Sequence, residues 1–240
     1  MQIIGSHRIY LKSIDSTNTF AQKLLSKNNP NEGTVISAGY QTSGKGQGSN
    51  KWQSEADKNI LLSFILYPKF LKASKQFYLS IFVANAIVNW LDKIIPEQPV
   101  RIKWPNDIYV GHQKLGGILI QNTLKADGIE HAVIGIGLNV LQQEFGELSN
   151  AVSLSMLTPL DQTLAKLTDD LILQLDHYYR MLSDGNFAWQ KSAFEQRMLY
   201  KGEKALVSTS EGKIDGTVLG IAEDGKIIMN VNGVVRKLAH

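Results

Sequence analysis

The sequence predicts an α+β protein in which a mixed, mostly antiparallel sheet carries helices packed on one face. Three strand-like runs between residues 100 and 140 are separated only by short turns, which favours antiparallel pairing over long crossover connections. Residues 74–95 and 158–182 repeat apolar side chains at helical spacing. After residue 200 the pattern changes to short alternating runs, and this change predicts a second, small β domain.

The first half of the chain is expected to begin with alternating strands and helices. HRIYLKSI alternates like a short strand. DSTNTFAQKLLSKNNP has helix-capping residues in front and Asn-Asn-Pro behind, which predicts a helix. GTVISAGYQ and NILLSFILYP are expected to be strands, the second of them buried. The helix over residues 74–95 should stop at Pro96.

The second half is expected to contain strands, then helices, then the small β domain. The runs VRIKWPNDIYV, KLGGILIQNTL and EHAVIGIGLNV are read as strands. Helices over 158–182 and 187–198 should follow. From Gly202 the pairs Glu-Gly, Asp-Gly and Asn-Gly are hairpin signals, which predict a small β-barrel with a thin core. We therefore expect one domain over residues 1–199 and a second over 200–240.

Composition excludes several classes of function. The 240 residues are 43% hydrophobic and include no cysteine, so disulfides, thiolate catalysis and cysteine-bound metals are excluded. A formal charge of +3 is too small to indicate a nucleic-acid partner. No apolar run approaches the roughly 20 residues that span a bilayer, and the N-terminus lacks a signal-peptide pattern. We expect a cytoplasmic protein with no membrane partner.

A glycine-rich stretch, GYQTSGKGQGSNKW, is the first candidate for chemistry. It reads G-x-x-x-x-G-K-G and is one residue short of a nucleotide-binding P-loop. A P-loop needs a hydroxyl where Gly46 stands and a helix directly afterwards, whereas QGSNKW favours a loop. A dinucleotide fingerprint fails for the same lack of a helix. A glycine-rich loop can still bring backbone amides close to a ligand, with Lys45 as a cation. The alternative is a mobile surface loop without a ligand.

Two later segments add charged and amide side chains. In KWPND, Asn106 and Asp107 supply the hard oxygen ligands that suit Mg²⁺, although an ordinary Pro-Asn-Asp turn explains them equally well. Lys114 opens KLGGILI, where Gly116 and Gly117 weaken a strand unless something approaches its backbone closely. The lysine is therefore a candidate anion holder, and a solvated charge at a strand end is the alternative.

In this order the segments resemble the biotin–protein ligase family, also called biotin–acetyl-CoA-carboxylase ligase, over roughly residues 9–240. IDSTN resembles the family's first biotin-contacting segment, and GKGQGSNKW resembles its biotin and adenylate loop, usually G-R-G-R-x-G-R-x-W. KWPND, KLGGIL and GIGLN match three further family segments. The resemblance implies the class II synthetase-like fold of the ligase domain, with a C-terminal SH3-like barrel.

The sequence departs from the family pattern in two places. Lys45 and Gln47 stand where the family usually has arginines, and Gly48-Ser49-Asn50 replaces a basic-Gly-basic run. Lysine is a point charge and lacks the planar fork of arginine, so the loop is expected to hold the intermediate less tightly or to share the work differently. IDSTN begins at residue 14, which leaves no room for the helix-turn-helix of bifunctional members. We expect a ligase without repressor activity and without a DNA partner.

The resemblance implies a two-step reaction. Biotin and ATP form biotinyl-5′-AMP, and a lysine of a biotin carboxyl carrier domain then displaces AMP. The carrier would belong to acetyl-CoA carboxylase or another biotin-dependent carboxylase. In this role Lys114 is the main catalytic candidate and Lys45 and Lys103 assist it, because an anion must attack a polyanion. Asn106 and Asp107 would place Mg²⁺ on the triphosphate.

The same resemblance implies the binding residues. Ser16, Thr17, Asn18 and Gln41 can hydrogen-bond the ureido ring of biotin. The remaining members of the binding set are Gly44, Lys45, Gly46, Gln47, Trp52, Lys114, Gly116, Gly117 and Asn139. Of these, Trp52 and Asn139 are expected on the adenine side, with a core anchor as the alternative for Trp52.

Two other functions stay open at this point. A lipoate–protein ligase or an octanoyl transferase would use a related fold on another acyl group. A biotin sensor would keep the pocket without turnover. The sequence also leaves open a homodimer formed through an exposed sheet edge.

Overall fold

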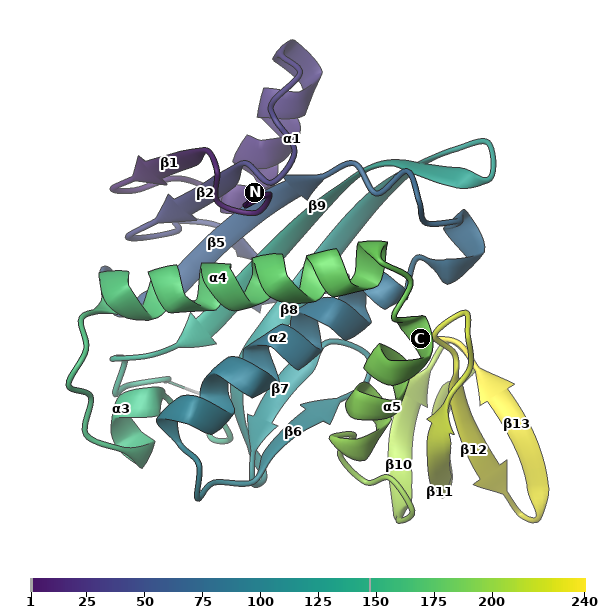
Figure 1. The fold of residues 1–240 in the computed structure, drawn as a ribbon. Helices are drawn as coiled ribbons and strands as arrows, with labels where there is room; N and C mark the ends of the chain where they lie inside the picture. Colours follow the sequence, from purple (N-terminus) through teal and green to yellow (C-terminus); the bar gives the residue numbers. More distant parts are fainter. Residues whose placement is uncertain (1, 147) are drawn as a thin grey trace.

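A seven-stranded sheet forms the centre of this computed structural model, which describes residues 2–146 and 148–240 (Figure 1). Its strands are β1 (Arg8–Leu11), β2 (Val35–Ala38), β5 (Asn59–Leu66), β6 (Val100–Lys103), β7 (Asp107–Val110), β8 (Gln113–Lys125) and β9 (Gly128–Asn139). They are arranged in the order β1-β2-β5-β9-β8-β7-β6. The pair β1–β2 is parallel and the other neighbours are antiparallel. The predicted mixed, mostly antiparallel sheet is therefore confirmed.

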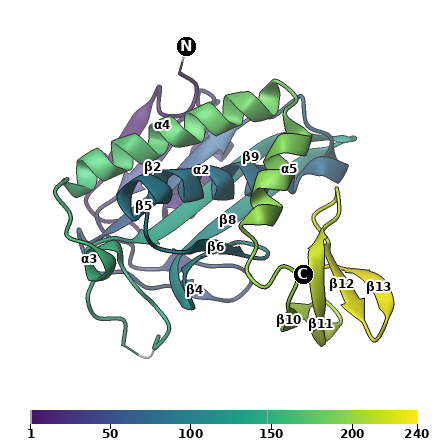
Figure 2. The ribbon, with the colours of Figure 1, turned by 60° about the horizontal axis from the view of Figure 1, so that its bottom comes forward.

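Helices cover both faces of this sheet. On one face lie α2 (Tyr78–Ile94), α4 (Leu164–Ser183) and α5 (Phe187–Gln196), which Figures 1 and 2 show on the same side. The helix α1 (Thr17–Lys27) packs on the opposite face, where Ala21 forms a small core with Ile36, Ile65 and Val133. The prediction that all helices lie on one face was therefore wrong for α1. All eight residues of β5 are buried, so both of its faces need apolar cover.

Successive side chains of the central strands point to opposite faces of the sheet, so each face has its own set of residues. In β5 and β9, Leu62, Phe64 and Ile134 point into the large core under α2 and α4. The residues between them, such as Ser63 and Gly135, point to the α1 side. Since α1 contacts β2, β5 and β9, it covers only one end of this second face. The uncovered part is where the cleft described below is found.

Two segments differ from the single strand and the loop that were read from the sequence. VRIKWPNDIYV contains the two antiparallel strands β6 and β7, with a turn at residues 104–106. The glycine-rich stretch forms a short hairpin from β3 (Gly44–Lys45) and β4 (Lys51–Trp52). A hairpin at this position confirms that no P-loop helix follows Lys45. Two short helical segments, η1 (Ala73–Lys75) and α3 (Leu154–Leu157), complete the connections.

The C-terminal region is an open sheet. Its strands are β10 (Lys204–Thr209), β11 (Gly212–Ile221), β12 (Ile227–Val231) and β13 (Val234–Leu238), paired antiparallel in that order. In the described part of the chain no ladder joins β10 to β13, so the predicted closed barrel was wrong. Val218, Ile227 and Met229 are buried in the same hydrophobic cluster as Phe194 of α5. The rest of the protein, including α5, therefore covers the apolar face of the C-terminal sheet, which a closed barrel would have buried in its own interior.

The proposed division between residues 199 and 200 falls in the connection between α5 and β10. Because one hydrophobic cluster includes residues from both sides of this point, the division into two domains stays a prediction. Within the described residues, no helix is both long and apolar enough to cross a membrane.

A buried tyrosine links α2 to the C-terminal sheet. Tyr78 is 1% exposed, and its hydroxyl donates a hydrogen bond to Oε2 of Glu223, 3.1 Å away. Burial, followed by this hydrogen bond and the negative charge of Glu223, raises the pKa of Tyr78 to about 12. The unfolded chain loses this proton near pH 10, so folding retains it over a higher pH range.

The link predicts a loss of stability in alkali. A raised folded-state pKa contributes stability that is fully present below pH ~10 and is lost as pH rises towards about 12. The free energy of unfolding of Tyr78→Phe should therefore decline less between pH 9 and 11.5 than that of the unmodified chain. Urea unfolding at both pH values measures the two declines, and an equal decline in both proteins would contradict the prediction.

Candidate active site

A cleft of about 720 Å³ opens on the face of the sheet that α1 leaves uncovered. It is bordered by the β3–β4 hairpin, the centre of β8 and β9, residues 103–107 and strand β10. The cleft brings together most of the residues predicted from the sequence. These are Ser16, Thr17, Asn18, Gln41, Lys45, Gly46, Gln47, Trp52, Lys103, Asn106, Asp107, Lys114 and Gly117.

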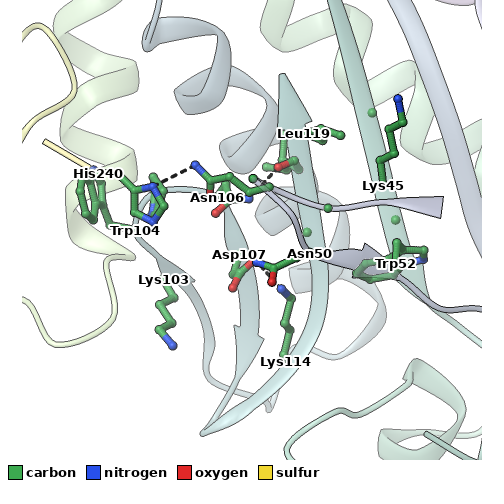
Figure 3. Close-up of a pocket in the computed structure, with 18 of the residues that line it drawn as sticks. Lys45, Asn50, Trp52, Lys103, Trp104, Asn106, Asp107, Lys114, Leu119 and His240 are labelled. Atoms are coloured by element: carbon green, nitrogen blue, oxygen red, sulfur yellow. Dashed lines mark hydrogen bonds and ion pairs between the residues drawn. The ribbon is translucent and has the colours of Figure 1, made fainter. Parts of the chain in front are cut away.

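An ion pair lies in the lining of the cleft. Nζ of Lys114, near the start of β8, is 2.6 Å from Oδ1 of Asp107, at the start of β7, and the two side chains point toward each other in Figure 3. Their side chains are 33% and 21% exposed, so the pair is partly shielded but still reaches the cleft. A Cβ on Gly117 would lie 3.7 Å from Nζ of Lys114. The glycine therefore keeps the space above the lysine free of side-chain atoms.

Backbone hydrogen bonds hold the lysine in place. The backbone nitrogen of Lys114 donates to the carbonyl of Asn150 at 2.7 Å, and its own carbonyl accepts from Val152 at 3.0 Å. The ammonium group is thus presented from a strand that is paired on both sides, which limits its movement.

Asn106 shapes the turn beside this ion pair. Its Nδ2 donates to the carbonyl of Ile118 at 2.8 Å, and its carbonyl accepts from the nitrogen of Ile118 at 2.9 Å. The amide oxygen of Asn106 makes no hydrogen bond within the described residues, and it lies next to the carboxylate of Asp107 in the sequence. No cluster of three or more His, Cys, Asp or Glu side chains gathers in residues 2–146 and 148–240. A metal at this place would rely on one carboxylate and one amide oxygen from the protein.

The cleft also contains a polar pocket whose amide groups are oriented by backbone and side-chain hydrogen bonds. The nitrogen and hydroxyl of Thr17 both donate to Oε1 of Gln41, at 2.8 and 3.0 Å. Nδ2 of Asn18 donates to the carbonyl of Leu119 at 3.4 Å and to Oε1 of Gln121 at 3.1 Å. A backbone N–H can only donate and a carbonyl can only accept, so both amide groups have one orientation. Gln41 consequently offers an N–H to a ligand, and Asn18 offers an oxygen.

Glycines on β9 make room for the side chains of this pocket. A Cβ on Gly135 would collide with Oδ1 of Asn18, and a Cβ on Gly137 would lie 2.5 Å from the ring of Trp52. These contacts explain the spacing in GIGLN, because every second residue of a strand faces the same side. Trp52 thus packs flat against β9 on the cleft side, and its buried indole N–H has no hydrogen-bond partner within the described residues.

Two predicted catalytic lysines lie at the margin of the cleft. Lys45 is exposed on the β3–β4 hairpin and extends away from Lys114 in Figure 3. Nζ of Lys103 is 3.3 Å from the hydroxyl of Tyr109 and 5.1 Å from the centre of its ring. In this structure only Lys114, of the three predicted catalytic lysines, pairs with a carboxylate in the cleft.

Three predicted binding residues lie outside the cleft lining. Gly44 pairs with Trp52 in the hairpin, and a Cβ on Gly116 would collide with Leu138 rather than reach the cleft. Asn139 is 5% exposed and donates to the carbonyl of Val152 at 3.1 Å. In this structure they contribute close packing and strand connection, and their part in ligand binding stays a prediction.

Several residues that line the cleft or contact its lining were not predicted. The hydroxyl of Ser63 contacts Thr17 and Asn18 from below, and Gln121 contacts Asn18 from β8. From the C-terminal sheet, Leu206 of β10 lines the cleft. Ser63 left a signal in the sequence, because it is the one hydroxyl inside the apolar run NILLSFIL. Leu206 left none, because its approach depends on how the C-terminal sheet packs.

The C-terminal end of the described chain also reaches the cleft. The rings of His240 and Trp104 meet edge to face with centroids 5.4 Å apart, and Nε2 of Gln47 lies 3.1 Å from Nδ1 of His240. The indole N–H of Trp104 donates to the carbonyl of Gly225 at 2.9 Å. The glycine-rich loop and the C-terminal sheet therefore share one wall of the cleft.

Comparisons with known proteins agree with this architecture. The model of the biotin/lipoate A/B protein ligase family matches residues 10–139. The bifunctional ligase/repressor BirA of Bacillus subtilis is 30% identical over 243 residues, covering 99% of this chain and 73% of the relative. BirA of Escherichia coli is 27% identical, with 98% and 73% covered. The structure of a biotin protein ligase from Aquifex aeolicus in complex with biotin and ATP superposes with a TM-score of 0.82 at 28% identity, covering 98% of this chain and 96% of that one.

Proposed function

The chain belongs to the biotin/lipoate A/B protein ligase family and is a ligase, and we propose that it uses ATP to join biotin to a lysine of a carrier protein. The observation that carries the proposal is the pairing of two features in one cleft. A pocket with one fixed donor and one fixed acceptor and the Lys114–Asp107 pair both line it. Biotin has a cyclic urea at one end and a carboxylate at the other, so it can use both.

The proposed reaction has two steps. In the first, an oxygen of the biotin carboxylate forms a bond to the α-phosphorus of ATP, the bond to the bridging oxygen breaks, and pyrophosphate leaves. In the second, the amine of the carrier lysine attacks the carbonyl carbon of biotinyl-5′-AMP, loses a proton and expels AMP. The proposed carrier is a biotin carboxyl carrier domain. Neither step needs a covalent bond to this protein.

Lys114 is proposed to stabilise the charge that gathers in the first step. An anion approaches a phosphate there, and a fixed ammonium group in a partly shielded cleft lowers the cost of bringing the two together. Asp107 holds that ammonium group in place at 2.6 Å. Lys45 and Lys103, at the margin, are proposed to raise the local concentration of the nucleotide by attracting its phosphates.

Magnesium is proposed to act with the triphosphate. Mg²⁺ commonly binds one or two carboxylates and completes its shell with substrate phosphates and water. The carboxylate of Asp107 and the amide oxygen of Asn106 fit that donor set, and these two residues would hold the ion. When bound, the ion neutralises charge on the phosphates.

The polar pocket favours biotin over lipoate or octanoate. The N–H of Gln41 and the oxygen of Asn18 need a ligand that carries a carbonyl and an N–H side by side. The dithiolane ring of lipoate and the alkyl end of octanoate have neither group. Either acyl chain would leave buried polar groups without partners, which costs about 1–3 kcal/mol for each group.

The proposal is tested by pyrophosphate exchange and by transfer. The purified chain, incubated with ATP, Mg²⁺ and labelled pyrophosphate, should form labelled ATP only when biotin is added. Addition of a carrier domain should then give the mass increase of one biotinyl group. Parallel reactions contain lipoate and octanoate. Turnover of either of these in place of biotin would identify a lipoate-type ligase, and biotin binding without exchange would identify a sensor.

A further inference from the structure

We propose that Ser63 and Gln121, neither of which lines the cleft, determine the specificity for a cyclic urea by orienting Asn18 and Thr17. The inference rests on the proposed function, since it concerns how that substrate is recognised. Both residues contact cleft-lining side chains from strands of the sheet and do not themselves line the cleft. They are positioning residues and act through the groups that touch the ligand.

Ser63 is a fully buried hydroxyl beneath the pocket. It lies in the middle of β5 and is 0% exposed. Its Oγ is 2.7 Å from Oγ1 of Thr17 and 2.5 Å from Oδ1 of Asn18. Gly135 is its neighbour across the ladder to β9, and the missing side chain there gives Asn18 the space to reach Ser63.

The hydroxyl of Ser63 restricts the orientation of the side chains of Thr17 and Asn18. It has one proton and donates to one of the two oxygens at a time. The proton of Thr17 goes to Oε1 of Gln41 at 3.0 Å. The amide oxygen of Asn18 can only accept, so its short contact requires the proton of Ser63, and Ser63 donates to Oδ1 of Asn18 at 2.5 Å. The amide oxygen of Gln41 stays engaged by the N–H and the hydroxyl of Thr17.

Gln121 completes the constraint from β8. Its Oε1 accepts a hydrogen bond from Nδ2 of Asn18 at 3.1 Å, and the carbonyl of Leu119 accepts the second at 3.4 Å. An amide nitrogen has two hydrogens, so Asn18 has no N–H left for a ligand. Asn18 can therefore receive an N–H from the ligand and cannot donate to it.

The result is a pocket with one acceptor and one donor at fixed places. A cyclic urea places an N–H beside its carbonyl, so it matches the oxygen of Asn18 and the N–H of Gln41 together. If Asn18 could rotate, its N–H would face the N–H of the ligand. Loss of one buried hydrogen bond of this kind corresponds to about a tenfold change in binding.

The test compares variants at the two positions. Ser63→Ala removes the donor, and Gln121→Leu removes the acceptor at similar size. Gln121→Glu keeps an acceptor oxygen at the same place. In biotin-dependent pyrophosphate exchange, Ser63→Ala and Gln121→Leu should raise KM for biotin about tenfold. KM for ATP and kcat at saturating biotin should stay within about twofold. Gln121→Glu should behave like the unmodified chain. Desthiobiotin keeps the cyclic urea and lacks the thioether ring, so its KM should rise by the same factor in Ser63→Ala and Gln121→Leu.

A matched control is Ser37→Ala on the neighbouring strand β2, which does not line the cleft and should leave every constant unchanged. An unchanged KM for biotin in Gln121→Leu would overturn the inference. So would a parallel loss in kcat and in both KM values, because that result indicates a general structural role. If Ser63→Ala does not fold, the comparison of Gln121→Leu with Gln121→Glu tests the inference by itself. Failure of the proposed function is separate, because it would appear as no biotin-dependent exchange in the unmodified chain.

Discussion

Replacing Lys114 by alanine should lower biotin-dependent pyrophosphate exchange by about 10²–10³-fold, the loss typical of removing a fixed electrostatic group that stabilises developing charge. Lys114 is the cation that pairs with Asp107 in the cleft at 2.6 Å. Its removal would also leave that carboxylate without a partner, and a free negative charge would repel both the biotin carboxylate and ATP. The KM values for biotin and for ATP should therefore rise while kcat falls.

Initial rates of exchange at varied biotin and ATP measure this effect. Lys125→Ala is the matched control, because Lys125 lies on the same strand, pairs with Glu130 at 3.2 Å and does not line the cleft. It should keep full activity. A Lys114→Ala variant that folds and exchanges pyrophosphate within about threefold of the unmodified chain would refute the electrostatic role assigned to this lysine.

Replacing Gly135 by alanine should weaken biotin binding by about 100-fold. The added methyl group would occupy the place of Oδ1 of Asn18, so Asn18 must leave its contacts with Ser63 and Gln121. Loss of about two buried hydrogen bonds accounts for an effect of this size. The substitution creates no backbone strain from a left-handed conformation, because Gly135 does not have a positive φ.

Isothermal titration with biotin measures the affinity, and thermal unfolding separates binding from folding. Gly128→Ala is the matched control on the same strand, since the nearest atom to its added Cβ is 3.9 Å away, and it should bind biotin normally. The double variant Gly135→Ala/Asn18→Ala removes the collision and should regain thermal stability without regaining affinity. Normal biotin binding by Gly135→Ala would show that Asn18 does not contact the ligand.

Local patterns were sufficient to predict most of the elements. The buried strand β5 and the helices α2 and α5 were expected from apolar periodicity and their stop signals. VRIKWPNDIYV was read as one strand-like run with a Pro-Asn-Asp turn as the alternative for its middle, and the structure divides the run there into β6 and β7. A prediction from apolar pattern joins the residues on both sides of a turn into one strand, and only the hydrogen-bonded register shows that they are two strands.

The two errors in fold concern which surfaces are covered. α1 was placed with the other helices, and the C-terminal strands were expected to close into a barrel. Amphipathic spacing shows that a helix has an apolar face and does not show which side of a sheet will receive it. The same limit applies to the C-terminal strands, because α5 supplies part of the cover that closure would have provided.

The sequence by itself determined the fold class and the main chemical groups. The glycine-rich loop, the KWPND segment and Lys114 each had a structural alternative when taken alone, and they were recognised because their order resembles that of one family's segments. Only the tertiary structure decided which of these groups meet. Asn139 donates to the carbonyl of Val152, Lys45 lies at the margin of the cleft, and Ser63 and Gln121 contact the cleft-lining Asn18. The physical reason is that hydrogen-bond direction and strand register arise from partners far apart in the chain, so no local pattern contains them.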